Sequence, residues 1–443
     1  MPAHRDFRDP VHGFIRIQGR ECDIVDTPIF QRLRRIRQLA MAHLVYPGAV
    51  HTRLEHTLGV VHVAGRLCGK LDIDAEHTRL VRLAALLHDI GHGPFSHPSE
   101  DVLSELASEA DRARAGATDK IHELITREII RTDPDLRRLI SDRDREDINK
   151  LLDQGLGEPV YKDLVSGPLD ADKQDYLLRD SHHCGVRYGI YDINRLQDVL
   201  CLVGDESGDA LAVDEDGVNT LEQFVLARYY LTTQVINHKI RRITDAMLVR
   251  GLKLGVQVDR IDFLHRLYTF ERTQAFIDEY VKWNDERLVS RLLEPEHEQT
   301  WAGKFMRRLA ERRLFKIVFR KRVTDFPDLA IDANRVAAIA GTLEQEVAAI
   351  LAVSPEEVIF KVHRSPPTRK SEGAVLISSH GQIEPFETRS LIFRSIDESL
   401  REEYLECYAP YCNQDDQERR TLKTRIEELV ARRVQELLDC PAA

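Results

Sequence analysis

An apolar stripe that runs directly into a cluster of histidines constrains the fold of this chain most strongly. Apolar side chains at positions 80, 83, 84 and 87 have the i, i+3, i+4, i+7 spacing of one buried helix face. The predicted helix, residues 76–87, stops at His88-Asp89-Ile90-Gly91, where Gly91 suits a C-terminal cap. A buried helix therefore delivers imidazole and carboxylate groups to one place.

The same periodicity predicts that most of the first three-quarters of the chain is helical. Asp26-Thr27-Pro28 supplies a capping residue followed by proline at the first helical position. Further elements are expected as helices over 28–40 and 52–71, from about 169, and over 219–254, with loops at 107–120 and 153–159 and a hairpin over 199–213.

The texture of the sequence changes after about residue 350. The runs VIFKVH, AVLISS and RSLIF are typical of strands and predict a small antiparallel sheet over about 355–396. A charged amphipathic helix is expected over 417–438. We therefore predict a mainly α fold, with a helical bundle over 1–320 and a C-terminal α+β region over 321–443.

Composition excludes several classes of protein. The 443 residues hold 63 Lys+Arg against 74 Asp+Glu, and the net charge of −11 argues against a nucleic-acid-coating chain, while a local basic cleft stays open. No apolar run approaches the roughly 18–20 residues of a membrane span, and the N-terminus lacks a signal-peptide pattern. Seven scattered cysteines without a CxxC pair predict reduced thiols and a cytoplasmic location.

The histidines are concentrated where the stripe ends. Eleven of the 18 lie in the first 125 residues, and HDIGHGPFSH places three of them in ten residues, on what its two glycines and proline predict to be a tight, exposed turn. His56 shares a helix stripe with Val60, Val63 and Leu67 and should face inward. A single buried histidine is usually a satisfied core residue, but several together with a carboxylate suit a transition-metal ion such as Zn, Fe, Mn, Co or Ni.

A further oxygen ligand should come from a distant helix. In DADKQDYLLRD, Asp172, Tyr176 and Asp180 lie at i, i+4 and i+8 and so share one helical face. Such a run is often a solvated charged surface. The tyrosine in its middle favours a face that lines a cleft.

The motifs, taken in order, resemble those of HD-domain phosphohydrolases, and within that superfamily the dNTP triphosphohydrolases. The resemblance rests on RDPVHG (8–13), DTPIFQRLRRIRQL (26–39), YPGAVHTRLEHTLGV (46–60), HDIGHGPFSH (88–97), IHE (121–123), DADKQDYLLRD (170–180) and NHKIRRITDAM (237–247). A weaker match follows at RRLFKIV (312–318). An isolated HD pair would be a weak signal, whereas the ordered set is specific.

The resemblance implies a role for each matching residue. The metal ligands are His56, His88, Asp89 and Asp172, holding a divalent transition metal (Mn, Fe, Zn, Ni or Co), alone or with Mg on the triphosphate. The catalytic positions are His92, His97, Glu100, His122 and Glu123, with His97 as general acid oriented by Glu100. The substrate positions are Gln38, Arg53, Lys173, Tyr176, Asp180 and Arg228, of which Gln38 and Asp180 hold the sugar 3′-OH. An allosteric nucleotide site matches Asp26, Gln31, Arg34, Arg312 and Lys316.

The implied reaction is hydrolysis of a nucleoside triphosphate at the α-phosphate, giving a nucleoside and inorganic triphosphate, by a homo-oligomer (dimer or tetramer) that a guanine nucleotide activates. Ile236 stands where an antiviral dNTP triphosphohydrolase of the resembling family has a tyrosine that excludes a ribose 2′-OH. Deoxyribose selectivity therefore stays open, with the neighbouring Tyr229 and Tyr230 as residues that could substitute for it. Two alternatives also stay open: an HD enzyme that cleaves another phosphate ester or a nucleic acid, favoured by the basic run at 32–37, and a silent nucleotide sensor. For the activator positions, ordinary surface ion pairs are an equal alternative.

Overall fold

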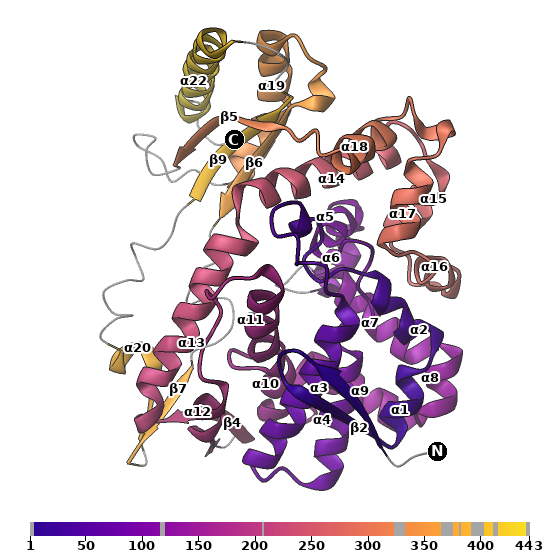
Figure 1. The fold of residues 1–443 in the computed structure, drawn as a ribbon, viewed down its shortest axis with the longest axis vertical. Helices are drawn as coiled ribbons and strands as arrows, with labels where there is room; N and C mark the ends of the chain where they lie inside the picture. Colours follow the sequence, from indigo (N-terminus) through magenta and orange to yellow (C-terminus); the bar gives the residue numbers. More distant parts are fainter. Residues whose placement is uncertain are drawn as a thin grey trace. The chain divides into compact units, whose positions relative to one another are not determined.

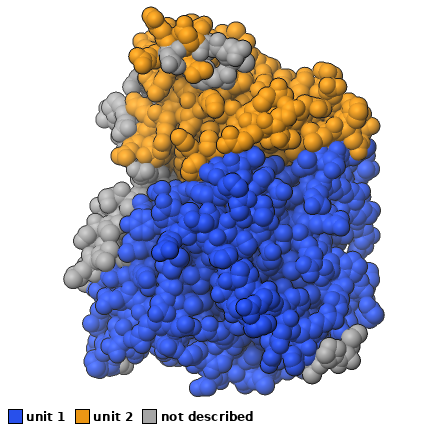
Figure 2. Space-filling model, in the orientation of Figure 1, with its two compact units in different colours: residues 1–236, 262–291, 368–397 blue, residues 237–261, 292–367, 398–443 orange. Residues whose placement is uncertain are grey.

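The computed structural model describes residues 4–115, 120–205, 208–322, 333–364, 375–380, 382–390, 403–410 and 415–439. The chain forms two compact units, each built from several stretches of sequence. Unit 1 comprises residues 1–236, 262–291 and 368–397, and unit 2 comprises 237–261, 292–367 and 398–443 (Figure 2). The predicted boundary at residue 320 divides the chain into two continuous stretches. These two units are each assembled from several stretches, so they do not test that boundary and it stays a prediction.

Unit 1 is mainly helical, as the sequence predicted (Figure 1). Its α-helices include α1 (Arg20–Val25), α2 (Pro28–Gln31), α3 (Arg53–Lys70), α4 (Ala75–Leu87), α5 (His97–Leu106), α6 (Glu109–Ala115), α7 (Ile121–Thr132), α8 (Pro134–Leu139), α9 (Asp142–Gln154), α10 (Pro159–Ser166), α11 (Ala171–Cys184), α12 (Ile193–Asp198), α13 (Val218–Leu231), α15 (Asp262–Tyr268), α16 (Gln274–Tyr280), α17 (Asp285–Leu292) and α20 (Phe386–Arg389).

The helices α3, α4 and α11 form the part of unit 1 that positions the site. Both α4 and α11 pack against α3. Helix α3 begins with a capping box in which Thr52 and Glu55 satisfy backbone N–H groups that would otherwise lack partners. Helix α11 is capped by Asp170 and ends at Gly185, whose φ of 68° is the left-handed conformation typical of glycine. The predicted stripe on α3 is confirmed, since His56, Val60 and Val63 are fully buried.

Unit 1 also contains two small sheets. Strands β1 (His4–Asp9) and β2 (Gly13–Gln18) form an antiparallel hairpin. The predicted hairpin at 199–213 is confirmed as β3 (Leu200–Asp205) and β4 (Gly208–Asp214). Strand β7 (Leu376–Ser379) adds to β4 in parallel, and β8 (Gln382–Pro385) pairs with β7. Strands β7 and β8 thus complete the sheet that β3 and β4 begin, although more than 150 residues separate β4 from β7.

Unit 2 is built around a three-stranded antiparallel sheet in the order β5 (Lys316–Arg322), β9 (Glu403–Ala409), β6 (Ile359–Arg364). Helices α19 (Ala333–Leu351) and α22 (Asp416–Asp439) supply the apolar residues that pack against it, among them Val347 and Ile426. The remaining helices are α14 (Lys239–Gln257) and α18 (Trp301–Ala310), which pack on each other. The predicted tail helix over 417–438 is confirmed as α22.

The single sheet predicted over 355–396 is wrong. Of its three runs, the first lies in β6 of unit 2 and the second in β7 of unit 1, whereas 391–393 lie outside the described residues. Alternation along a strand shows that it pairs but not with which neighbour, so partners distant in sequence are invisible to the pattern.

Three helix boundaries also differ from the predictions. The segment from Pro28 is a short helix followed by a 3₁₀ turn over Arg32–Arg35, and it does not continue to residue 40. The predicted helix over 219–254 is broken by a π turn over Thr232–Ile236, between α13 and α14. The loop expected at 107–120 contains α6.

Candidate metal and phosphohydrolase site

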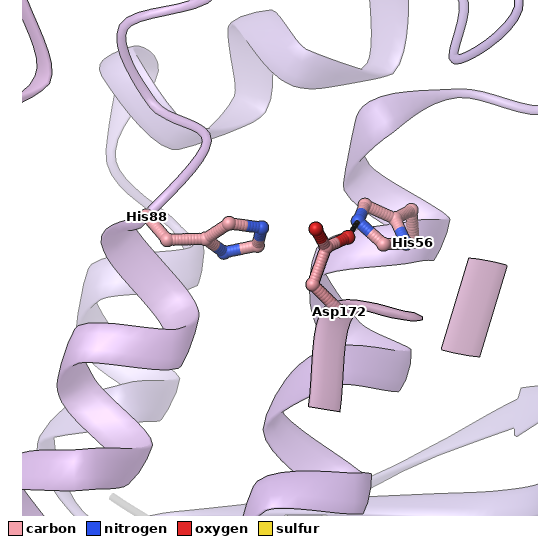
Figure 3. A group of neighbouring side chains, drawn as sticks. All are labelled: His56, His88 and Asp172. Carbon is pink, nitrogen blue, oxygen red and sulfur yellow. Dashed lines mark ion pairs between the residues drawn. The ribbon is translucent and has the colours of Figure 1, made fainter. Parts of the chain in front are cut away.

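Three predicted metal ligands converge from three helices. His56 comes from α3, His88 from the end of α4 and Asp172 from the first turn of α11. One ligand atom of each lies within 4.8 Å of the others. Figure 3 shows the Asp172 carboxylate between the two histidines, with the His88 ring pointing toward it from one side and His56 on the other side. The donor set of two imidazoles and one carboxylate suits a divalent transition metal.

The Nδ1 atoms of His56 and His88 both have hydrogen-bond partners outside the converging group. Nδ1 of His56 lies 2.8 Å from Asp175 Oδ2, and Nδ1 of His88 lies 2.8 Å from the carbonyl oxygen of Ala85. Each Nδ1–H therefore donates away from the site, and this leaves Nε2 to face inward. Both Nε2 atoms are buried: Nε2 of His56 lies 2.9 Å from Asp172 Oδ1, and Nε2 of His88 has no hydrogen-bond partner among the described residues. Buried polar atoms in this state fit a cation between them.

The charges around His56 favour a bound cation or proton. Burial lowers the pKa of His56, but the carboxylates of Asp172 and Asp175 outweigh burial and raise this pKa to about 10. For Asp172, burial raises the pKa, and the neighbouring His56 lowers it to about 2. The site therefore holds anionic carboxylates at neutral pH, which the metal ligands of a hydrolase require.

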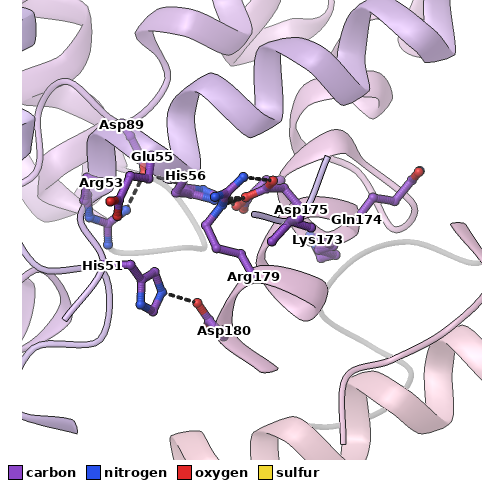
Figure 4. Close-up of polar contacts among 12 residues, drawn as sticks. His51, Arg53, Glu55, His56, Asp89, Lys173, Gln174, Asp175, Arg179 and Asp180 are labelled. Atoms are coloured by element: carbon purple, nitrogen blue, oxygen red, sulfur yellow. Dashed lines mark hydrogen bonds and ion pairs between the residues drawn. The ribbon is translucent and has the colours of Figure 1, made fainter. Parts of the chain in front are cut away.

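Asp89, the fourth predicted ligand, lies beside this group and also forms an ion pair with the side chain of Arg53. Its Oδ1 is 3.4 Å from His88 Nε2, and its Oδ2 is 3.7 Å from His56 Nε2. The same Oδ2 accepts a hydrogen bond of 2.5 Å from Arg53, as Figure 4 shows. Burial raises the pKa of Asp89, but Arg53 outweighs it, so the pKa lies well below its ordinary value. Asp89 is thus ionised, buried and within 4 Å of the Nε2 atoms of His88 and His56, although it is not one of the three converging residues.

The predicted catalytic histidines form a stack next to Asp89. The His92 and His122 rings are stacked with centroids 3.9 Å apart, and His92 Nε2 is 3.3 Å from Asp89 Oδ1. Burial, then Arg53 and His122, hold the pKa of His92 well below its ordinary value, so this imidazole is neutral. Glu100 accepts from His122 Nδ1 at 2.8 Å and from the His122 backbone N–H at 3.0 Å.

His97 and Glu123 complete the predicted catalytic set. His97 is exposed at the first position of α5, and its ring centroid is 5.9 Å from that of His92. Glu123 lies on α7 beside His122 and is 3.4 Å from Lys120 Nζ. The described contacts of Glu100 join it to His122, and its proposed role toward His97 stays a prediction.

The turn that carries these groups is buried, so the exposed turn predicted for 88–97 is wrong. Of residues 91–98, His97 alone is exposed. Gly91 is not a left-handed cap either. A Cβ at Gly91 would lie 2.4 Å from the His122 carbonyl oxygen, so glycine is needed because α7 passes this close.

The predicted substrate residues surround the site and already have protein partners. Asp180 Oδ1 is 2.7 Å from His51 Nε2 (Figure 4), and Gln38 is bonded through its backbone N–H to the His51 carbonyl. Gln38 Oε1 is buried without a partner in the described part of the chain. Lys173 Nζ donates to Asp170 at 2.7 Å and to the Gly167 carbonyl at 3.0 Å.

Tyr176 and Arg228 are half-buried on α11 and α13. The structure leaves their roles toward a substrate as predictions. Ile236, at the end of the π turn, is half-buried as well.

The predicted activator residues fall in both units. In unit 1, Asp26 accepts two hydrogen bonds from Arg5, at 2.6 and 2.7 Å. Arg34 Nε donates to Gln31 Oε1 at 2.7 Å, and Gln31 in turn donates to the Val25 carbonyl. Arg312 and Lys316 are exposed in unit 2. The three residues of unit 1 are adjacent, and a nucleotide site across both groups stays a prediction.

The sequence analysis missed a buried network behind His56. Asp175 is fully buried and binds three partners: His12 Nε2 at 2.7 Å, His56 Nδ1, and Arg179 through two hydrogen bonds of 2.8 Å. Arg179 also donates to Asp9 at 2.7 Å. The i, i+3 spacing of Asp172 and Asp175 and the i, i+4 spacing of Asp175 and Arg179 were available as signals in the sequence.

The class of the protein follows from this fold and site together with two family matches. Residues 53–175 match the HD domain, and residues 191–425, more than half of the chain, match the HD associated region. The chain therefore belongs to the HD-domain phosphohydrolases, a family of hydrolases whose HD domains bind divalent metals.

Individual relatives narrow the comparison. The chain is 30% identical over 334 residues to the uncharacterized protein YwfO of Bacillus subtilis (strain 168), covering 72% of each chain. It is 29% identical over 341 residues to the deoxynucleoside triphosphate triphosphohydrolase SAMHD1 of Homo sapiens, covering 70% of this chain and 54% of that one. The chain thus spans about half the length of that relative. A phosphohydrolase structure from Bacteroides thetaiotaomicron VPI-5482 shares the fold, with a TM-score of 0.72, 24% identity, and coverage of 91% and 98%.

Proposed function

We propose that this chain hydrolyses nucleoside triphosphates at the α-phosphate and releases a nucleoside and inorganic triphosphate. The observation that carries the proposal is the convergence of His56 Nε2, His88 Nε2 and the Asp172 carboxylate, with both Nδ1 atoms bonded outward. The reaction type is supported by the relative whose name is deoxynucleoside triphosphate triphosphohydrolase.

His56, His88 and Asp172 would hold the divalent metal, with Asp89 beside them. When bound, the metal supplies Lewis-acid chemistry toward a phosphoryl oxygen. The chain supplies positive charge and proton transfer. Arg53 is buried and points at the ligand group, so a phosphate there would meet a desolvated cation. His97 is exposed at the first position of α5, which suits a general acid that must exchange protons with water.

A local cluster of cations is required because a triphosphate carries about four negative charges and the chain has a net charge of −11. Arg53, Lys173 and Arg228 are the proposed source. In the structure Arg53 is bonded to Asp89, and Lys173 to Asp170. A triphosphate would therefore have to draw them from these carboxylates, which favours a highly charged substrate over a neutral ester.

One ground for the nucleic-acid alternative is weaker than the sequence indicated. Arg32, the first residue of the basic run, is buried and donates to the carbonyl oxygens of Trp283 and Ile90. The Arg37 guanidinium contacts His43. The run is therefore not one continuous basic surface. Another phosphate ester as substrate remains the second candidate because of Ile236.

The discriminating experiment is incubation of the purified chain with each of the eight nucleoside triphosphates and Mn²⁺, followed by chromatography of the products. We expect nucleoside and triphosphate. Nucleoside diphosphate and phosphate, or no product from any of the eight, would contradict cleavage at the α-phosphate. Comparison of the ribose and deoxyribose series assigns the sugar preference that Ile236 leaves open.

Several finer features belong to the same proposal. The five cysteines in the described part of the chain are all free thiols, which supports a reducing, cytoplasmic location. Within the described residues no helix is long and apolar enough to cross a membrane. We also propose a homo-oligomer with an activator site that includes Asp26, Gln31 and Arg34. Adding GTP should then change the oligomer mass or the rate, and a flat response of both to millimolar GTP would remove the activator site from the proposal.

A further inference from the structure

A buried carboxylate from α17 ties together the two loops that border the site. Asp285 is 4% exposed. Its Oδ1 accepts the backbone N–H of Phe95 at 2.7 Å, and its Oδ2 accepts the backbone N–H of Arg37 at 3.0 Å. These two loops are distant in sequence from each other and from Asp285. The carboxylate is therefore a crosslink between them.

The loop at Phe95 needs such a restraint because its backbone is strained. Phe95 has a φ of 63°, and Ser96 has a φ of 57° with a ψ of −114°. Side chains other than glycine rarely adopt these conformations, and they persist only where the surroundings enforce them. A hydrogen bond from the strained residue to a buried carboxylate is such an enforcement.

The second loop connects the crosslink to Arg53. The Ser96 hydroxyl donates to the Arg37 carbonyl at 2.7 Å and accepts from Arg53 Nε at 2.9 Å. These hydrogen bonds close a ring through Asp285 and Arg37 by way of the peptide bond between Phe95 and Ser96. The guanidinium of Arg53 is attached to this ring at the Ser96 hydroxyl. The neighbours of the ring in sequence are Gln38 and His97.

Resting on the function proposed above, we propose that Asp285 is a positioning residue that sets the placement of Arg53 and His97 toward the phosphates. Burial raises the pKa of Asp285 to about 6, against the two N–H groups, which lower it. In the described contacts the carboxylate touches neither the converging ligands nor Asp89, and it is linked to Asp89 only through Ser96 and Arg53. The contacts among His56, His88 and Asp172 do not involve it, so metal content is measured separately from positioning.

Asp285→Asn tests the proposal, because an amide can accept from one N–H group but presents its NH₂ to the other. The matched control is Asp262→Asn, an exposed aspartate of the same unit whose carboxylate is 2.7 Å from Arg266. We expect amide exchange, measured by mass spectrometry, to accelerate in peptides covering 36–38 and 93–97 in Asp285→Asn alone. Unchanged exchange in both peptides would overturn the crosslink, whatever the protein hydrolyses.

The kinetic measurement uses the ester that the unmodified protein hydrolyses best. We expect kcat of Asp285→Asn to fall about 10–100-fold with unchanged metal per chain, because small misplacements of catalytic groups have effects of this size. A lower melting temperature with an unchanged kcat per folded molecule would reduce Asp285 to a structural role and refute positioning. Should Asp285→Asn fail to fold, Ser96→Ala breaks the same ring at its hydroxyl, and an unchanged kcat there would equally refute it. Accelerated exchange without any hydrolysis by the unmodified protein would instead contradict the proposed function.

Discussion

Gly59→Ala is the most direct test of how the packing of α11 on α3 holds the predicted metal ligands in place. Gly59 lies one turn after His56 on α3, where α11 crosses. A Cβ there would lie 1.9 Å from Asp175 Oδ1 and 2.4 Å from an Arg179 guanidinium nitrogen. Both are side-chain ends, but neither can move freely. Asp175 is bonded to His12 and His56, and Arg179 is bonded to Asp9.

The size of the effect follows from these contacts. An ordinary contact needs about 1.5 Å more room than the site offers. Forcing α3 and α11 apart is overpacking, at about 1–3 kcal/mol. Turning Asp175 away instead breaks a buried ion pair, at about 3–5 kcal/mol. We therefore expect the free energy of unfolding to fall by about 3 kcal/mol, and metal affinity to fall about 10–100-fold through loss of the His56 Nδ1 partner.

Gly69→Ala is the matched control, because Gly69 lies on the same helix and a Cβ there meets nothing within 4 Å. Alanine should stabilise that position by about 0.5–1 kcal/mol. Urea denaturation followed by circular dichroism gives both changes, and metal analysis by mass spectrometry gives occupancy. If Gly59→Ala matched Gly69→Ala in stability and metal content, the close approach of α11 to α3 would be wrong.

Further predictions concern Asp175, the protonation of His56, and His97. Asp175→Asn should weaken metal binding about 10–100-fold with little change in helix content, and wild-type affinity in a chelator competition would contradict the role of Asp175 in orienting His56. Because the pKa of His56 is raised from 6.5 to about 10, its proton stabilises the metal-free fold below pH 6.5, and this contribution is lost as the pH rises through 10. The same proton competes with a cation at Nε2, so metal affinity should rise between pH 7 and 10, and a pH-independent affinity would count against this. His97→Ala should lose about 10²–10⁴ in kcat yet bind nucleotide, and unchanged turnover would remove His97 from the acid role.

The sequence could predict the residues that meet because they lie on strongly periodic helices. The stripe through His56 placed that imidazole on the inner face of α3, and burial of the whole stripe confirms it. The spacing in α11 likewise put Asp172 and Asp180 on one side of the helix. In both cases the relevant pattern is local, and the tertiary contact only completes what the helix geometry dictates.

What could not be predicted is which partner each polar group takes. The cation of Arg53 faces Asp89, 36 positions away, and Asp285 reaches Phe95 across 190 positions. No periodicity relates such residues, because the pairing depends on how whole elements pack. The strand β7 is similar, since its run of apolar residues predicted a strand but not its parallel partner β4.

The adjacency of His88 and Asp89 has a physical explanation in how the two carboxylate oxygens of Asp89 are used. Oδ1 lies 3.4 Å from His88 Nε2 and 3.3 Å from His92 Nε2, while Oδ2 is bonded to Arg53. One oxygen thus faces the imidazoles, and the other neutralises a buried guanidinium that would be costly alone. Since consecutive side chains at a helix end diverge, His88 can reach Asp172 while Asp89 serves Arg53. A histidine followed directly by an aspartate at the end of α4 can therefore join the proposed metal ligands and the proposed phosphate-binding residue Arg53 in a single buried network.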